Sequence, residues 1–166
     1  MRAQPGRIDA LRGVAREGLG VLWAKATGAY RRSIAAAALI RDEEGRLLLV
    51  ENAFPKRSWG LPGGRLERRE EARAGLAREV REETGFEVRV GELLTVVVRP
   101  TVVVLVFAAA IVGGESRPAP VEIAQVVWLP EVEARRRLAA KARRHLEAAL
   151  RGGQAGYLWD PAGASE

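Results

Sequence analysis

Several segments of the chain are short apolar runs bounded by turn residues, which is typical of β-strands. From Ser33 the stretches "SIAAAALIR" and "RLLLVE" flank an acidic turn, "DEEG", and together they predict a β-hairpin. Three further segments are rich in β-branched residues and predict strands: "FEVRVGELLTVVVRP" (86–100), "TVVVLVFAAAIV" (101–112) and "EIAQVVWLP" (122–130). The second of these is apolar enough to predict a central strand.

The hydrophobic period changes to that of an α-helix in three places. Helices are predicted over residues 8–24, from about Glu70 to Thr84, where Gly85 ends the helix, and from Glu131 to Leu150. The stretch "NAFPKRSWGLPGG" (52–64) has no period and predicts a loop that approaches other backbone closely. The amphipathic first helix could pack on the domain, on a second subunit in a homodimer or on a membrane surface, and packing within the protein or its dimer is favoured.

The amino-acid composition excludes several kinds of functional site. The 166 residues include no Cys and one His, which excludes disulfides, thiolate zinc sites and cysteine nucleophiles. The net charge of +6 comes mostly from Arg and suits an anionic partner such as a nucleotide, although solvated basic faces are the simpler interpretation. The longest apolar stretch, residues 102–112, is too short for a transmembrane segment, and charges interrupt any signal peptide. Cytoplasmic residence is the expectation.

The predicted second helix carries an unusual acidic cluster. Glu79, Glu82 and Glu83 lie at i, i+3 and i+4, so they share one helix face, where like charges repel each other. The apolar stripe of this helix leads into Glu79 and Glu83, which places carboxylates toward the core. Gly75 lies on the same flank as Glu82, and its missing side chain would admit another segment. Arg78 can pair with Glu82, but one guanidinium cannot neutralise three carboxylates.

A divalent cation would relieve this repulsion. Carboxylates in a partly desolvated cleft protonate unless cations compensate them, and Mg²⁺ prefers oxygen ligands beside substrate phosphates. The alternative is a solvated surface helix whose charges alternate for solubility, and the helix by itself leaves both interpretations open.

The surrounding residues favour the metal. The stretch Gly64 to Phe86 resembles the signature of the Nudix hydrolases, G-x5-E-x7-R-E-U-x-E-E-x-G-U with U apolar, and the preceding "WGLPG" resembles the lead-in of that family. The matching positions are Gly64, Glu70, Arg78, Glu79, Val80, Glu82, Glu83, Gly85 and Phe86. The resemblance implies an α/β fold, an α/β/α sandwich with a mixed β-sheet between helices. It places a Nudix domain at residues 31–151, after a helical extension (1–30) and before a tail (152–166).

The family pattern also implies a metal site. Carried over residue by residue, it makes Glu79 and Glu83 ligands of Mg²⁺ or Mn²⁺, and Glu82 a ligand of a second ion or an activator of water. The carbonyl of Gly63, beside Gly64, would complete the coordination.

Other residues would support this site. The resemblance implies that Arg78 orients Glu79 and Glu82, and that Glu70 braces the loop and helix from outside the ligand sphere. Glu82 is the preferred general base, Glu122 is the reserve, and Glu115 of the same opposite loop is a further candidate. The simpler interpretation of Glu122 is an ordinary charged residue at the start of a strand.

The implied activity is metal-dependent hydrolysis of a nucleoside diphosphate linked to another moiety, X, into a nucleoside monophosphate and phosphorylated X. Pro100 favours ADP-ribose or another sugar nucleotide because it resembles a proline of ADP-ribose pyrophosphatases, although it serves equally well as a turn. Nucleoside triphosphates, oxidised ones included, remain open, as does a non-catalytic nucleotide-binding regulatory module. No specific nucleic-acid binding is expected, because the cations are dispersed and no such motif is present.

A few aromatic residues and the lone histidine complete the prediction. Trp59 and Trp128 could stack on a base, but core positions are favoured. Tyr157 and Trp159 of the tail are expected to dock on the body of the protein or on a second subunit. His145 is expected at the surface or at its boundary and receives no function.

Overall fold

The computed structural model describes residues 32–53, 57–118, 121–151 and 156–159. The chain divides into two units, Met1–Arg32 and Ser33–Glu166, and the fold is that of the second unit. The helix predicted over residues 8–24 lies outside the described residues.

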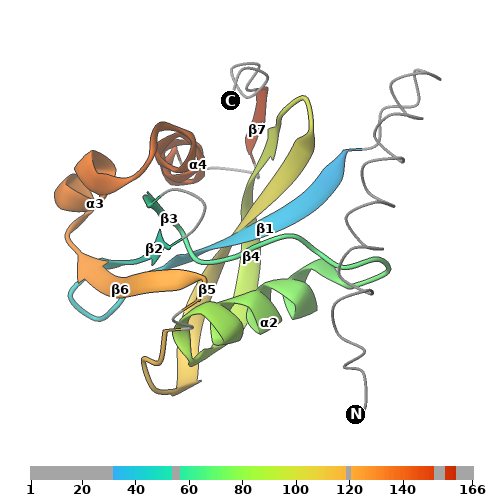
Figure 1. Cartoon of the computed structure of the whole chain (residues 1–166). Helices are drawn as coiled ribbons and strands as arrows, with labels where there is room; N and C mark the ends of the chain where they lie inside the picture. Colours follow the sequence, from blue (N-terminus) through green and yellow to red (C-terminus); the bar gives the residue numbers. More distant parts are fainter. Residues whose placement is uncertain (1–31, 54–56, 119–120, 152–155, 160–166) are drawn as a thin grey trace, which may run out of the picture. The chain divides into compact units, whose positions relative to one another are not determined.

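The second unit has α/β architecture, as predicted (Figure 1). In chain order its elements are β1 (Ser33–Ile40), β2 (Leu47–Asn52), β3 (Ser58–Gly60), α2 (Ala72–Thr84), β4 (Phe86–Val98), β5 (Val102–Gly114), β6 (Ile123–Leu129), α3 (Glu131–Arg137), α4 (Ala140–Leu150) and β7 (Gly156–Trp159). A mixed sheet has the order β1-β5-β4-β7, and a smaller antiparallel sheet has the order β3-β2-β6. Within the described residues, no helix is long and apolar enough to cross a membrane.

Strand β5 lies between two neighbours, which confirms the central position predicted from its apolar run. It pairs in parallel with β1 from Ser33↔Val102 to Ile40↔Ala109, and antiparallel with β4. Side chains of a strand alternate between the two faces of the sheet, and β1 and the first part of β5, residues 102–109, contribute to a core cluster on each face. This double burial explains why both strands read as nearly continuous apolar runs.

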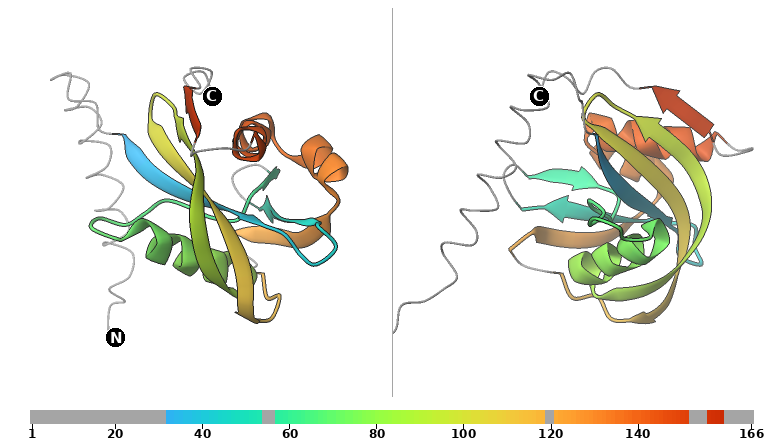
Figure 2. Two further views of the ribbon diagram at one scale, coloured as in Figure 1. Left: turned by 180° about the vertical axis from the view of Figure 1, so that it is seen from behind. Right: turned by 90° about the vertical axis from the view of Figure 1, so that its right-hand side faces the viewer.

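Two helices cover opposite faces of the mixed sheet (Figure 2). On one face Leu76 and Val80 of α2 pack with Ala36 and Ala38 of β1. On the other, Leu146 of α4 belongs to the core cluster formed with the intervening positions of β1. The sheet therefore lies between helices, and the alternation along β1 assigns its residues to one layer or the other.

The predicted hairpin is wrong, although both of its strands exist. The first pairs with β5 and the second with β3 and β6, so β1 and β2 belong to different sheets. Between them the structure has the isolated bridge Arg41↔Leu47 and the turn that it encloses, in which Asp42 N donates to Arg46 O and Gly45 N to Asp42 O. The physical reason is that β1 is apolar on both faces, and pairing with β5 places it between two core clusters, which buries more of it than a local pairing would.

Two other expectations change in detail. The segment 52–64 contains the short strand β3, which pairs with β2. The closing helix is broken into α3 and α4, because Leu138 and Ala139 adopt extended backbone conformations. Leu138 is buried there, and the Ala139 N–H donates to the carbonyl of Trp59, so tertiary contacts replace one turn of helix. The second helix begins near its predicted start, and Gly85 ends it in a left-handed conformation.

The C-terminal segment forms a strand on the body of the protein. Strand β7 pairs in parallel with β4, from Thr95↔Gly156 to Val98↔Trp159, and it is the red strand beside β4 in Figure 2. Leu158 packs against the core cluster on the side of α4. This agrees with the expectation that the tail docks on the body.

Candidate active site at the glycine turn

The site begins with the glycine turn, residues 61–66, which runs along the edge of β1 that faces away from β5. Three backbone hydrogen bonds hold it there: Ala36 N to Gly64 O (2.9 Å), Ala38 N to Pro62 O (2.8 Å) and Leu66 N to Ile34 O (3.0 Å). The turn therefore satisfies donors and acceptors of an edge strand and has a definite position relative to the sheet.

Both glycines of this turn make close contacts where a side chain would not fit without a shift of its neighbours. Gly63 has φ 134°, and a Cβ there would overlap the carbonyl oxygen of Ala36. A Cβ at Gly64 would overlap the carboxylate of Glu79 on α2. The absence of side chains thus lets the turn lie between β1 and the acidic face of the helix.

Glu83 is the most buried carboxylate of this face, with 8% of its surface exposed. Its Oε2 accepts a hydrogen bond of 2.7 Å from the backbone N–H of Gly63. Burial raises the pKa of Glu83 to about 8 despite this hydrogen bond, and the charges of Glu79, Glu122 and Glu82 add to the increase. The helix face predicted to point inward therefore does so.

Glu79 lies one turn earlier on the helix, against Gly64. Burial raises its pKa, the Arg78 guanidinium acts in the opposite direction, and the charges of Glu82 and Glu122 raise the pKa further. Glu122 precedes β6 and is exposed, so it reaches the cluster only as a nearby negative charge from another segment.

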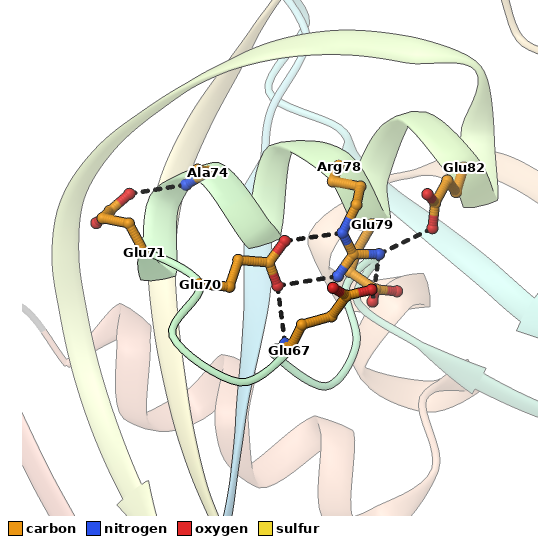
Figure 3. Close-up of polar contacts among 7 residues, drawn as sticks. All are labelled: Glu67, Glu70, Glu71, Ala74, Arg78, Glu79 and Glu82. Atoms are coloured by element: carbon orange, nitrogen blue, oxygen red, sulfur yellow. Dashed lines mark hydrogen bonds and ion pairs between the residues drawn. The ribbon is translucent and has the colours of Figure 1, made fainter. Parts of the chain in front are cut away.

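Arg78 links the acidic residues (Figure 3). Its Nη1 lies 2.9 Å from a carboxylate oxygen of Glu79 and 2.9 Å from one of Glu82, which confirms the predicted i,i+4 pair. Its Nε and Nη2 bond both oxygens of Glu70, at 2.9 and 3.1 Å. Such a bidentate pair restricts the guanidinium to one orientation, and the bonds to Glu70 are the main reason why the pKa of Arg78 is raised.

Glu70 joins the loop to the helix. Besides Arg78, it accepts a hydrogen bond of 2.8 Å from the backbone N–H of Glu67. The two contacts lower the pKa of Glu70 to about 2, with the Arg78 bonds as the larger cause. A Cβ at Gly75 would come within 2.7 Å of the Glu70 carboxylate and 2.6 Å of the Leu66 side chain. Gly75 thus admits the segment that the sequence predicted would approach there.

The structure brings most of the predicted site residues together. Those in contact around the turn and α2 are Gly63, Gly64, Glu70, Arg78, Glu79 and Glu83. Glu82 joins them through Arg78, and its side chain remains 54% exposed. Glu115 is exposed, and its carbonyl oxygen lies against Gly85 at the far end of the helix.

The sequence did not predict the pocket next to the turn, which has a volume of about 480 Å³. Gly63 and Gly64 belong to its wall, and so do Arg65, Lys141 and His145. His145 is 9% exposed, so the expectation of a surface or boundary residue is corrected. The signal that could have found this wall is the helical spacing of Lys141 and His145, which places both on one face of α4.

Trp59 and Trp128 occupy partly buried positions packed against the core, as favoured from the sequence. The guanidinium of Arg137 lies 5.1 Å from the centre of the Trp59 ring, which gives that ring a cation–π partner within the protein.

Comparison with known proteins identifies the family. The NUDIX domain model matches residues 31–150. The chain belongs to the Nudix family. A MutT-like protein of Streptomyces ambofaciens is 40% identical over 117 residues, which cover 69% of this chain and 75% of that protein. A human protein named 8-oxo-dGDP phosphatase NUDT18 is 37% identical over 99 residues, or 56% of this chain and 31% of the human one.

A solved structure of a MutT protein from Methanosarcina mazei Go1 has the same fold, with a TM-score of 0.62 and 28% identity. The match covers 71% of this chain and 92% of that one. Together with the family match, these relatives identify the Nudix chain as a hydrolase that acts on pyrophosphate bonds.

Nudix proteins use divalent metal ions, and the donors of this site fit such an ion. The fit rests on an excess of carboxylates over cations. Glu70, Glu79 and Glu82 all pair with the single guanidinium of Arg78. Burial and the neighbouring negative charges raise the pKa of Glu83 to about 8, and a divalent ion would favour its ionised form. Within the described part of the chain, no three acidic or histidine side chains converge closely enough to hold an ion as they stand. An ion therefore requires side-chain movement, for which the exposed Glu82 has the most room.

Proposed function

We propose that this Nudix chain is a metal-dependent pyrophosphohydrolase that cleaves a nucleoside diphosphate linked to another moiety, X, into a nucleoside monophosphate and phosphorylated X. The observation that carries the proposal is the pair Glu79 and Glu83, held inward against Gly63 and Gly64 with too few cations to balance them. A site that had lost its metal would gain stability by replacing such carboxylates, since each costs free energy when buried and ionised.

The metal would be Mg²⁺ or Mn²⁺, with Glu79, Glu83 and Glu82 as its carboxylate ligands and the Gly63 carbonyl as a further candidate. When bound, a divalent ion supplies Lewis acidity that offsets the negative charge of the diphosphate. The chain's own residues do the rest. Arg78 holds Glu79 and Glu82 at their places, and Glu70 holds Arg78 and the loop.

Glu82 is the proposed base that accepts the proton of the attacking water. Its side chain is 54% exposed, so water reaches it, and the Arg78 contact limits its movement. Glu122 is the reserve, because it brings a carboxylate charge toward Glu79 and Glu83 from the segment before β6.

Two substrate classes follow from the sequence: sugar nucleotides such as ADP-ribose, and nucleoside triphosphates, oxidised ones included. The name of the human relative refers to an oxidised deoxynucleoside diphosphate, which supports keeping oxidised nucleotides among the candidates. The partner of the site is in each case a small-molecule nucleotide.

The test is a panel of nucleoside diphosphate derivatives incubated with and without Mg²⁺ or Mn²⁺, with phosphate species followed by ³¹P NMR. Metal-dependent release by the wild type, lost in Glu82→Gln and retained in Glu92→Gln, supports the proposal. Glu92 is an exposed glutamate of β4 and serves as the matched control. Turnover without metal, or full turnover by Glu82→Gln, contradicts it. A rise in melting temperature with a nucleotide but no turnover would favour a binding module instead.

A further inference from the structure

The pocket beside the glycine turn has an unusual lining. Small side chains form much of it, from Ala35 to Ala37 on β1 and Ala142 on α4, and this leaves a volume of about 480 Å³. That volume lies in the range of small-ligand sites in proteins. Gly63 and Gly64 belong to the same wall, and these two glycines also contact Glu83 and Glu79 of α2, so the glycine turn is shared by the pocket and the acidic cluster.

The charges of this lining are all of one sign. Arg65, Arg99 and Lys141 line the pocket, whereas no Asp or Glu does. Arg65 and Lys141 are exposed, and among the described residues neither side chain forms an ion pair or hydrogen bond. Two cations that face a shared space without a carboxylate between them create a local positive potential, which favours an anion.

The remaining lining limits what that anion is. Among the described residues no Phe, Tyr or Trp lines the pocket, so the imidazole of His145 is its one aromatic ring. Its other polar side chains, Asn52, Thr101 and His145, can each donate a hydrogen bond. Because the charged side chains of the lining are all cations, the pocket suits a phosphoryl group better than a neutral sugar, which has no charge to pair with them.

We propose that Arg65 and Lys141 determine specificity by binding a phosphoryl group that the substrate carries outside the bond to be cleaved. The inference rests on the proposed function, because it assigns a substrate class to the same site. It favours nucleotides with a third phosphate, such as triphosphates or sugar nucleotides with an added phosphate, over plain ADP-ribose. The two residues reach the pocket from different segments, the glycine turn and α4.

The kinetic test uses substrate pairs that differ by one phosphate: ADP-ribose against ADP-ribose 2′-phosphate, and deoxynucleoside diphosphates against triphosphates. In at least one pair the wild type is expected to show a KM about tenfold lower for the member with the extra phosphate. Arg65→Ala and Lys141→Ala should remove this difference and leave the KM of the other member unchanged. Lys141→Arg should restore it. Arg143→Ala removes an exposed cation of α4 outside the pocket and should change neither.

A second measurement separates failure of this inference from failure of the proposed function. Calorimetric titration of pyrophosphate into the metal-free protein in EDTA needs no turnover, and the acidic cluster repels anions under these conditions. Binding that weakens about tenfold in Arg65→Ala and in Lys141→Ala, but not in Arg143→Ala, supports the pocket even if no substrate is cleaved. The inference would be overturned if pyrophosphate does not bind, or if the wild type has equal KM values for the two members of both pairs. It would also be overturned if Arg65→Ala and Lys141→Ala raise KM equally for both members of each pair.

Discussion

Replacement of Glu83 by Gln should stabilise the metal-free protein at neutral pH. The folded pKa of this carboxyl is about 8, whereas its ordinary value is 4.5, and the side chain is buried. The folded state therefore favours the protonated form. Its contribution to stability is fully present below about pH 4.5 and is lost as the pH rises through about 8. Gln keeps an oxygen that can accept the Gly63 N–H, and it never ionises.

The size of the effect follows from the difference between the two pKa values. One unit corresponds to about 1.4 kcal/mol, so the full difference between 4.5 and about 8 is roughly 5 kcal/mol. Between about pH 5.5 and 7.5 the ionisation of Glu83 should lower the free energy of unfolding of the wild type by about 2.5 kcal/mol. Glu83→Gln has no such ionisation and should show no such decrease. That loss is a large fraction of the 5–15 kcal/mol by which domains of this kind are typically stable.

The assay is urea unfolding of both proteins in EDTA at several pH values, with Glu92→Gln as an exposed control of equal charge change. The wild-type and Glu83→Gln free energies of unfolding should converge toward acid pH and separate toward neutral pH. With Mg²⁺ in place of EDTA the difference in free energy of unfolding between the two proteins should become smaller or change sign, because the metal would stabilise the ionised wild-type carboxylate. Free energies that run parallel across the pH range in EDTA would refute the argument from burial.

Three other substitutions probe the rest of the site and the core. Gly64→Ala should lower kcat about 100-fold in steady-state kinetics while circular dichroism stays native, because the new Cβ displaces the Glu79 carboxylate; unchanged kcat would contradict the packing. Arg78→Lys should lower kcat at least about tenfold, since one ammonium cannot replace the forked contacts with Glu70, Glu79 and Glu82, and equal kcat would exclude that role. Leu146→Ala should reduce the free energy of unfolding by about 2–5 kcal/mol in urea titration, because Leu146 is fully buried; a change within 0.5 kcal/mol would show that α4 is not anchored there.

Local sequence determined the acidic helix well. The spacing of Glu79, Glu82, Glu83 and Arg78 specifies a single helix face, and such relations depend on only a few neighbouring residues. The end at Gly85 was also predictable, because a left-handed residue without a Cβ ends helices cheaply. The positions of the main strands followed from period and composition for the same reason.

Strand pairing and the break in the closing helix depend on contacts between segments that are distant in the sequence. Whether β1 pairs with β2 or β5 depends on which arrangement buries both of its apolar faces, and β5 lies more than 60 residues away in the chain. The break after Arg137 likewise depends on a contact between Ala139 and Trp59, which no helical period in 131–150 reveals. The hydrophobic pattern of a short segment does not reveal interactions that form only when segments distant in the sequence come into contact.

The sequence by itself determined the elements, the acidic helix face and the family resemblance, because periods and motif spacings are properties of a continuous chain. Only the tertiary structure decided that the turn at Gly63 closes on Glu83, that the charge of Glu122 lies near the same cluster, and that Arg65 and Lys141 line one pocket. These relations depend on how the sheet and α4 pack. Burial against those partners raises the pKa of Glu83, and the packing of α4 beside the glycine turn brings Lys141 and Arg65 to one pocket.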